Sequence, residues 1–150
     1  MNKIKPLPEE WSGLLNSEQK EAIENIQGPL LIIAGAGSGK TRVLTYRYAH
    51  LIKTYGINFE NILAITFTNK AANEMKERIS QLLNLELSPK WISTFHSLCV
   101  KMLRIHGHHI GFNNNFTIYD QSDSTKLIRN CMKDSDIDTK QYSPKRIQAH

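Results

Sequence analysis

A run of small residues that ends in a lysine and a threonine carries the clearest chemistry in this sequence. The run is Ala34-Gly35-Ala36-Gly37-Ser38-Gly39-Lys40-Thr41, which departs from the pattern G-x-x-x-x-G-K-[ST] only at its first position. Small side chains let backbone N–H groups surround phosphates, while Lys40 reaches the β- and γ-phosphates and the Thr41 hydroxyl binds Mg²⁺. The alternative is a glycine-rich turn without a ligand, and the order of the surrounding elements favours nucleotide binding.

A phosphate loop needs a strand before it and a helix after it, and the hydrophobic pattern predicts both. Residues 30–34 are continuously apolar, which predicts a buried parallel strand. Apolar residues then recur at helical spacing up to Gly56, which predicts a helix over about residues 40–54. Two more strands, at residues 62–67 and 91–93, are each followed by a helical stripe. This alternation predicts an α/β domain with a parallel sheet flanked by helices.

The segment before the loop predicts a helix that begins after Asn16. Asn16 is a good N-cap, and Gln19 follows three residues later, as in a capping box. Gly28-Pro29 is expected to end this helix.

The region after Gly111 has a different character. Residues 116–119 suit a short strand, an apolar stripe through residues 127–132 predicts a helix, and Ser143-Pro144 has the form of another helix start. Only six residues follow Pro144, so we expect the sequence to be a piece of a longer protein.

Composition is that of an ordinary soluble domain and excludes few functions. The 150 residues are 40% hydrophobic and 22% charged, with a formal net charge of +5 at pH 7. No apolar run approaches the ~20 residues of a membrane helix. Cys99 and Cys131 fit neither a disulfide framework nor a zinc site, so we expect a reducing, cytoplasmic setting. Residues 87–119 contain no acid, which suits either a solvated basic face or a polyanion-binding surface.

Four segments together resemble the motifs of superfamily 1A DNA helicases, the UvrD/PcrA/Rep group. In the family's order they are the Q motif and motifs I, Ia and Ib, at residues 15–19, 34–42, 64–72 and 92–97. The likeness covers about residues 14–120. It implies a RecA-like P-loop NTPase fold, incomplete here, with the N-terminal part of the ATP-binding motor domain at 1–120 and the start of a helical inserted subdomain at 121–150.

The resemblance also implies a function. The longer protein is expected to be an ATP-dependent DNA helicase or translocase that uses ATP and Mg²⁺ and moves 3′ to 5′. Its partners are expected to be single-stranded DNA and junctions of single and double strands, in repair or replication. The piece itself is expected to be a monomer.

The nucleotide site that the resemblance implies comprises Gln19, Ala34, Gly35, Ala36, Gly37, Ser38, Gly39, Lys40, Thr41 and Arg42. Lys40 and Thr41 take the catalytic roles, and Thr41 also holds the metal. Gln19 reads the adenine edge unless the capping box occupies its amide. Arg42 stacks on the base unless it is a solvated helix residue, and stacking calls for an aromatic partner.

The DNA-binding residues that the resemblance implies are Thr66, Phe67, Thr68, Asn69, Thr94 and His96. Phe67 stacks on a base, or else it packs in the core. Thr66, Thr68 and Asn69 offer polar groups to phosphates, although Asn69 also suits a plain N-cap. Thr94 opens a helix beyond a strand end, and His96 is either a contact near DNA or a structural histidine. Phe95 begins an apolar stripe and is expected in the core.

A nucleotide-hydrolysing motor also needs a carboxylate for Mg²⁺ beside a catalytic glutamate. The one candidate here, Asp120, is followed by Gln121 and is better explained as a helix cap. We therefore expect no hydrolysis or unwinding by these 150 residues alone. Two alternatives remain, a self-contained P-loop kinase or other NTPase that uses Asp120, and a non-catalytic nucleic-acid-binding module, against which the intact Lys40-Thr41 pair argues.

Overall fold

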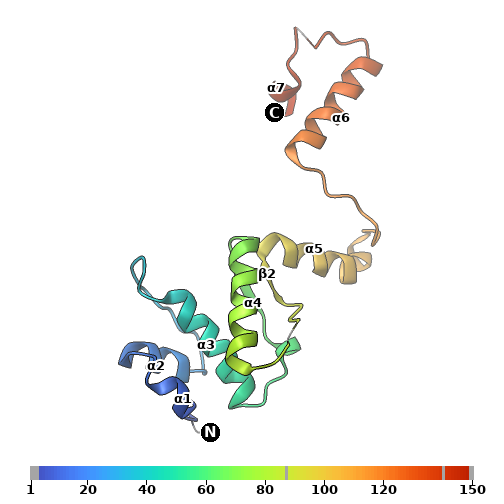
Figure 1. Cartoon of the computed structure of the whole chain (residues 1–150). Coiled ribbons are helices and arrows are strands. Elements are labelled where there is room, and N and C mark those ends of the chain that lie inside the picture. Colours follow the sequence, from blue (N-terminus) through green and yellow to red (C-terminus); the bar gives the residue numbers. More distant parts are fainter. Residues whose placement is uncertain (1–3, 87, 140, 149–150) are drawn as a thin grey trace. The chain divides into compact units, whose positions relative to one another are not determined.

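The computed structural model describes residues 4–86, 88–139 and 141–148 (Figure 1). The chain divides into two compact units, the first ending at Met102 and the second beginning at Leu103. All candidate site residues predicted from the sequence lie in the first unit. The division into a motor-domain part and an inserted subdomain near residue 120 stays a prediction.

The N-terminal half of the first unit is helical. It contains α1 (Glu9–Ser12), α2 (Ser17–Glu24), α3 (Lys40–Lys53) and a short 3₁₀ helix, η1 (Phe59–Asn61). Helix α2 packs on α3. The buried apolar cluster around them comprises Trp11, Leu15, Ile23, Val43, Tyr46 and Ala49. The helix predicted at residues 40–54 is confirmed within one residue.

The start of α2 is the capping box that the sequence predicts. The Asn16 side chain accepts from the Gln19 backbone N–H, and the Gln19 side chain accepts from the Asn16 N–H. Helix α2 is also tied to α3, because the Arg47 guanidinium donates to the carbonyls of Ala22 and Asn25. The Arg47 bonds hold the C-terminal end of α2 beside the middle of α3.

A strand–helix–strand segment supplies the α/β part of the unit, with β1 (Ala64–Thr66), α4 (Asn69–Leu83) and β2 (Ile92–Thr94). The two strands pair in parallel, with Thr66 opposite Thr94. Their carboxyl ends therefore meet at one edge of the sheet. A second buried cluster, Tyr48, Ala72, Met75, Ile79 and Ile92, lies between the helices and the strands. The α/β class and the parallel arrangement are thus confirmed.

Helix α5 (Phe95–His106) follows β2 directly, and the division between the two units falls within it. The second unit continues with η2 (Gly107–Ile110), α6 (Gln121–Asp134) and α7 (Pro144–Gln148). Helices α6 and α7 pack on each other. No helix of the described residues has the length and apolar character needed to cross a membrane.

Two predicted strands are wrong. Residues 30–34 form no strand in the structure, and Leu31 and Ile33 are 82% and 89% exposed. A parallel strand is stable only beside a partner, and in the described sheet β1 and β2 pair only with each other. Residues 116–119 also form no strand, and Ile118 and Tyr119 are exposed there.

Candidate functional site

The glycine-rich loop leads straight into α3, which begins at Lys40. Gly39 precedes the helix in the left-handed region, with φ of 89°, and no side chain caps the first turn in the described structure. The first N–H groups of a helix lack intrahelical partners, and they carry positive potential. The start of α3 therefore offers backbone donors to an anion, as a phosphate loop requires.

Gln19 lies against this loop. Its Nε2 donates to the Ser38 carbonyl at 3.2 Å while its Oε1 accepts from the Asn16 N–H at 3.2 Å. Gly39 has a φ of 89°, so this position needs glycine for its backbone conformation, and a Cβ atom there would lie 2.8 Å from the movable Gln19 Nε2. The sequence predicts competition between the capping role of Gln19 and a ligand role, whereas the structure shows the cap and a loop contact made together.

The Lys40 side chain folds back over the loop. Its Nζ donates to the carbonyls of Ala34 and Gly35, at 2.9 and 2.6 Å. The side chain is exposed, so no core contact holds it. The ammonium group thus lies at the loop whose N–H groups would receive a phosphate.

Thr41 and Arg42 lie on the first turn of α3 and are both exposed. The Thr41 carbonyl accepts from Thr45 Oγ1 at 2.7 Å, whereas the Thr41 hydroxyl forms no hydrogen bond with the described residues. Arg42 has an aromatic partner in its own helix, because its Cζ lies 5.7 Å from the ring centroid of Tyr46. Sequence reasoning missed this partner, although a spacing of four residues on a helix indicates contact.

No group of three or more His, Cys, Asp and Glu side chains in the described parts of the chain could hold a metal ion. A Mg²⁺ ion that arrives with a nucleotide needs fewer protein ligands, because phosphate oxygens and water supply the rest. The exposed Thr41 hydroxyl beside an uncapped helix start fits that arrangement. The metal role of Thr41 stays a prediction.

The second group of predicted residues meets at the edge where β1 and β2 end. Thr66 and Thr94 are register partners, and Phe67 follows β1 with 98% of its surface exposed. Core packing of Phe67 is therefore excluded in this structure. The prediction of a buried Phe95 is wrong, since it is 60% exposed. Phe95 is the first residue of α5 and projects from the edge, whereas Leu98 is the residue of this helix that is buried.

The turn after β1 also starts α4. Thr68 Oγ1 accepts from the Ala71 N–H at 3.1 Å and caps the helix, so the alternative in which Asn69 is the N-cap is wrong. Thr66 Oγ1 donates to the Thr68 carbonyl at 3.0 Å. The exposed Asn69 side chain stands on the first turn of the helix.

The turn after β2 has a similar design. Thr94 Oγ1 accepts from the Ser97 N–H at 3.3 Å and donates to Ser97 Oγ at 2.9 Å. His96 is exposed and lies edge-on to the Phe95 ring, with centroids 6.1 Å apart. The structure therefore gathers two threonines, two aromatic rings and a histidine at one edge.

Asp120, the one carboxylate that the sequence offers for a metal, lies in the second unit. Asp120 caps α6, as predicted, with its side chain accepting from the Asp123 N–H at 2.8 Å. The hydrogen bond from the Asp123 backbone is the main reason why the pKa of Asp120 lies below its usual value. Its carboxylate is therefore already used within the helix.

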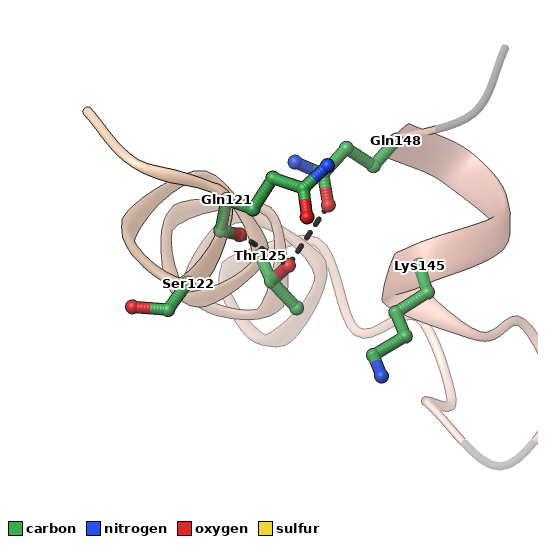
Figure 2. A pocket seen from close by; sticks show the side chains of 5 residues that line it. All are labelled: Gln121, Ser122, Thr125, Lys145 and Gln148. Atoms are coloured by element: carbon green, nitrogen blue, oxygen red, sulfur yellow. Dashed lines mark hydrogen bonds between the residues drawn. The ribbon is translucent and has the colours of Figure 1, made fainter. Parts of the chain in front are cut away.

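A cavity of about 600 Å³ lies between α6 and α7, lined by Gln121, Ser122, Thr125, Lys145 and Gln148 (Figure 2). Figure 2 shows the Thr125 hydroxyl bonded to both helices, at 2.7 Å from the Gln121 carbonyl and 2.8 Å from Gln148 Oε1. The bond between Thr125 and Gln148 thus joins α6 to α7. None of the predicted site residues lines this cavity.

Comparison with known proteins gives a consistent result. Residues 15–150 match the family model described as the UvrD/REP helicase N-terminal domain. The chain is 50% identical over 131 residues to the ATP-dependent DNA helicase PcrA of Staphylococcus aureus, and 52% identical over 131 residues to the PcrA of Staphylococcus epidermidis. Each alignment covers 87% of this chain and 18% of the relative, so the chain spans under a fifth of their length.

Proposed function

The chain belongs to the UvrD/REP helicase N-terminal domain family, and we propose that it forms the ATP-binding part of an ATP-dependent DNA helicase. Within this proposal, residues 1–120 belong to a RecA-like P-loop motor domain and residues 121–150 begin a helical inserted subdomain. The observation that carries the nucleotide assignment is the uncapped start of α3, with the Lys40 ammonium group folded over the loop that precedes it.

The proposed nucleotide site assigns a task to each side chain. The loop N–H groups and Lys40 bind the phosphates, the Thr41 hydroxyl holds Mg²⁺, Gln19 contacts the adenine edge, and Arg42 stacks on the base. Mg²⁺ held by the Thr41 hydroxyl would neutralise negative charge on the nucleotide. This chain's own residues bind and orient the nucleotide, and the absence of an Asp-Glu pair in the sequence supports a site that does not hydrolyse ATP by itself.

The proposed DNA path runs over the edge where β1 and β2 end. In open α/β sheets ligands collect at the carboxyl edge of the strands. Phe67 offers an exposed ring for stacking, and the starts of α4 and α5 lie beside it. Single-stranded DNA and its junctions with duplex are the proposed substrates. The 3′-to-5′ direction, a role in repair or replication and a cytoplasmic setting remain part of the proposal.

The nucleotide assignment is tested by replacing the lysine. Lys40→Ala should weaken ATP binding roughly 10- to 100-fold, because charge-assisted hydrogen bonds contribute about 1.5–3 kcal/mol. The melting temperature should stay the same, since the side chain is exposed. Calorimetric titration of both forms, with Lys20→Ala on α2 as the matched control, measures the effect. Equal affinity of the wild-type chain and Lys40→Ala would remove the phosphate loop from the proposal.

The DNA assignment is tested in the full-length protein. Phe67→Ala should cost about 1–3 kcal/mol of affinity for single-stranded DNA if the ring stacks on a base. Nucleotide affinity without DNA and the melting temperature should barely change, because the ring is 98% exposed. Fluorescence anisotropy with a labelled single strand, beside a thermal melt, separates the cases. A variant that melts earlier and shows no selective DNA defect would take Phe67 off the DNA path.

A further inference from the structure

Helix α2 is held at its two ends by different parts of the nucleotide region. Near its start, Gln19 Nε2 donates to the Ser38 carbonyl of the loop at 3.2 Å. At its end, Arg47 Nη1 on α3 donates to the Ala22 carbonyl at 2.6 Å and to the Asn25 carbonyl. Ala22 follows Gln19 by three residues, so the Arg47 bond lies only about 4.5 Å along α2 from the residue that contacts the loop.

The charge of Arg47 is balanced by backbone carbonyls, because it has no acidic partner among the described residues. The side chain is half-buried, and this burial lowers the pKa of its guanidinium below the ordinary value. The last carbonyls of a helix lack intrahelical partners and carry negative potential. The guanidinium therefore satisfies the open end of α2, and the end of α2 compensates the half-buried charge.

Apolar packing alone does not fix where α2 lies along α3. Ile23 is fully buried and belongs to the same cluster as Val43 and Tyr46. The hydrophobic effect is non-directional, whereas a hydrogen bond weakens steeply when its geometry changes. The Arg47 bonds thus set the position of α2, and with it the distance of Gln19 from the loop.

We propose that Arg47 is a positioning residue of the nucleotide site, which holds the Gln19 amide against the loop by holding the end of α2. The inference rests on the proposed contact of Gln19 with adenine and deepens it. Arg47 acts through Gln19, since its own guanidinium is taken up by the α2 carbonyls. Its loss lets α2 shift along α3, which weakens the bonds that Gln19 makes at the loop and to the base.

The test is a double-mutant cycle in the full-length protein, measured by calorimetric titration without DNA. The ligands are non-hydrolysable analogues of ATP and GTP, and inorganic tripolyphosphate, which has no base. Arg47→Met removes the donors and keeps an aliphatic stem. It should weaken the ATP analogue about fivefold, reduce its preference over the GTP analogue, and leave tripolyphosphate unchanged.

The second arm of the cycle removes the residue through which Arg47 acts. Gln19→Ala should weaken the ATP analogue about tenfold. In the Gln19→Ala background, Arg47→Met should then cause no further loss, because coupled residues are not additive. A merely structural role of Arg47 predicts instead that the ATP analogue and tripolyphosphate weaken together in both backgrounds.

Two further variants control the comparison. Arg47→Lys restores the charge and a donor without the planar fork, and should recover part of the loss. If Arg47→Met does not fold, Arg47→Lys replaces it in the cycle and should give a smaller loss that again vanishes in Gln19→Ala. Arg129→Met removes an exposed guanidinium from α6 and should leave every affinity unchanged.

The outcomes separate the inference from the proposed function on which it rests. If Gln19→Ala weakens the ATP analogue and the Arg47 variants do not, the nucleotide site stands and the inference is overturned. Additive losses in the double variant also overturn it. If Gln19→Ala is neutral while Lys40→Ala weakens binding, the adenine contact is wrong and the inference falls with it. If the ATP analogue does not bind at all, the nucleotide assignment fails as well.

Discussion

Helices α3 and α6 begin in opposite ways. Helix α6 fills its own positive end, because the Asp120 and Asp123 side chains each accept from the backbone N–H of the other residue. Helix α3 begins directly after Gly39 and has no side-chain cap in the described structure. Both ends attract anions through the same backbone groups. The comparison teaches that a helix start is open to a ligand only when the chain supplies no anion of its own.

The largest effect on ATP affinity is expected when a carboxylate is placed before α3, as Asp120 stands before α6. Ser38→Asp places a negative charge in the loop, where like charges should repel the phosphates of ATP. The expected loss is about a hundredfold in affinity, equivalent to about 2.8 kcal/mol. Ser38→Asn is the neutral control of the same shape, and calorimetry with ATP measures both.

The outcome for Ser38→Asp depends on where the nucleotide lies. The Ser38 hydroxyl donates to the Gly35 carbonyl at 2.7 Å, so both variants disturb this internal bond equally. A similar loss in Ser38→Asn would show that loop shape, and not charge, sets the affinity. Undiminished binding to Ser38→Asp would place the ligand away from the start of α3.

The two regions should also differ in their response to pH. His50 on α3 is fully buried, and burial lowers its pKa below the ordinary 6.5. The neutral ring suits the fold, so its stability contribution is complete above pH 6.5 and is lost as the pH falls below that value. The pKa of Asp120 lies below the ordinary 3.8, so the contribution of its carboxylate is complete above pH 3.8 and is lost below it.

Residue-resolved amide exchange between pH 7.5 and 3 should therefore show α3 losing protection before α6. His50→Leu removes the titrating ring together with its contact to Thr54 Oγ1, and the first loss should disappear. If α3 of the His50→Leu variant still lost protection between pH 6.5 and 5, another group would be responsible.

The smallest effect is expected when the capping carboxylate at the start of α6 is removed. Asp120→Ala should lower the melting temperature of the second unit slightly, because one capping hydrogen bond is lost. ATP affinity should stay the same, since the start of α6 has no glycine loop or lysine before it. A thermal melt and an ATP titration check both statements. A gain in ATP binding would mean that an open helix start is sufficient for a site.

The helix caps of this fold are predictable from the sequence, because a capping side chain bonds to a backbone group only three or four residues away. Asn16 with Gln19, and Asp120 with its helix, form the predicted caps. The strand expected at residues 30–34 fails because a strand depends on a distant partner, which periodicity does not reveal. Burial is also non-local. Phe95 has the right spacing for a core residue but lies at the sheet edge.

In the candidate sites, too, contacts between neighbouring residues are predictable from the sequence and contacts between distant segments are less so. The loop, Lys40 and Thr41 are contiguous in the sequence, so the structure adds only their hydrogen bonds. The strand–helix–strand order made the parallel direction of β1 and β2 predictable, whereas the register that pairs Thr66 with Thr94 comes from the structure.

The Lys40 amine has one further consequence. Its Nζ already donates to two loop carbonyls, at 2.9 and 2.6 Å. A nucleotide phosphate would therefore have to replace these acceptors. Capture of a phosphate is an exchange reaction, in which one set of acceptors replaces another. The contribution of Lys40 to the affinity is then a net value, smaller than the full strength of its bonds to phosphate. The carbonyls of Ala34 and Gly35 thus occupy the hydrogen-bond donors of Lys40 that a phosphate would use.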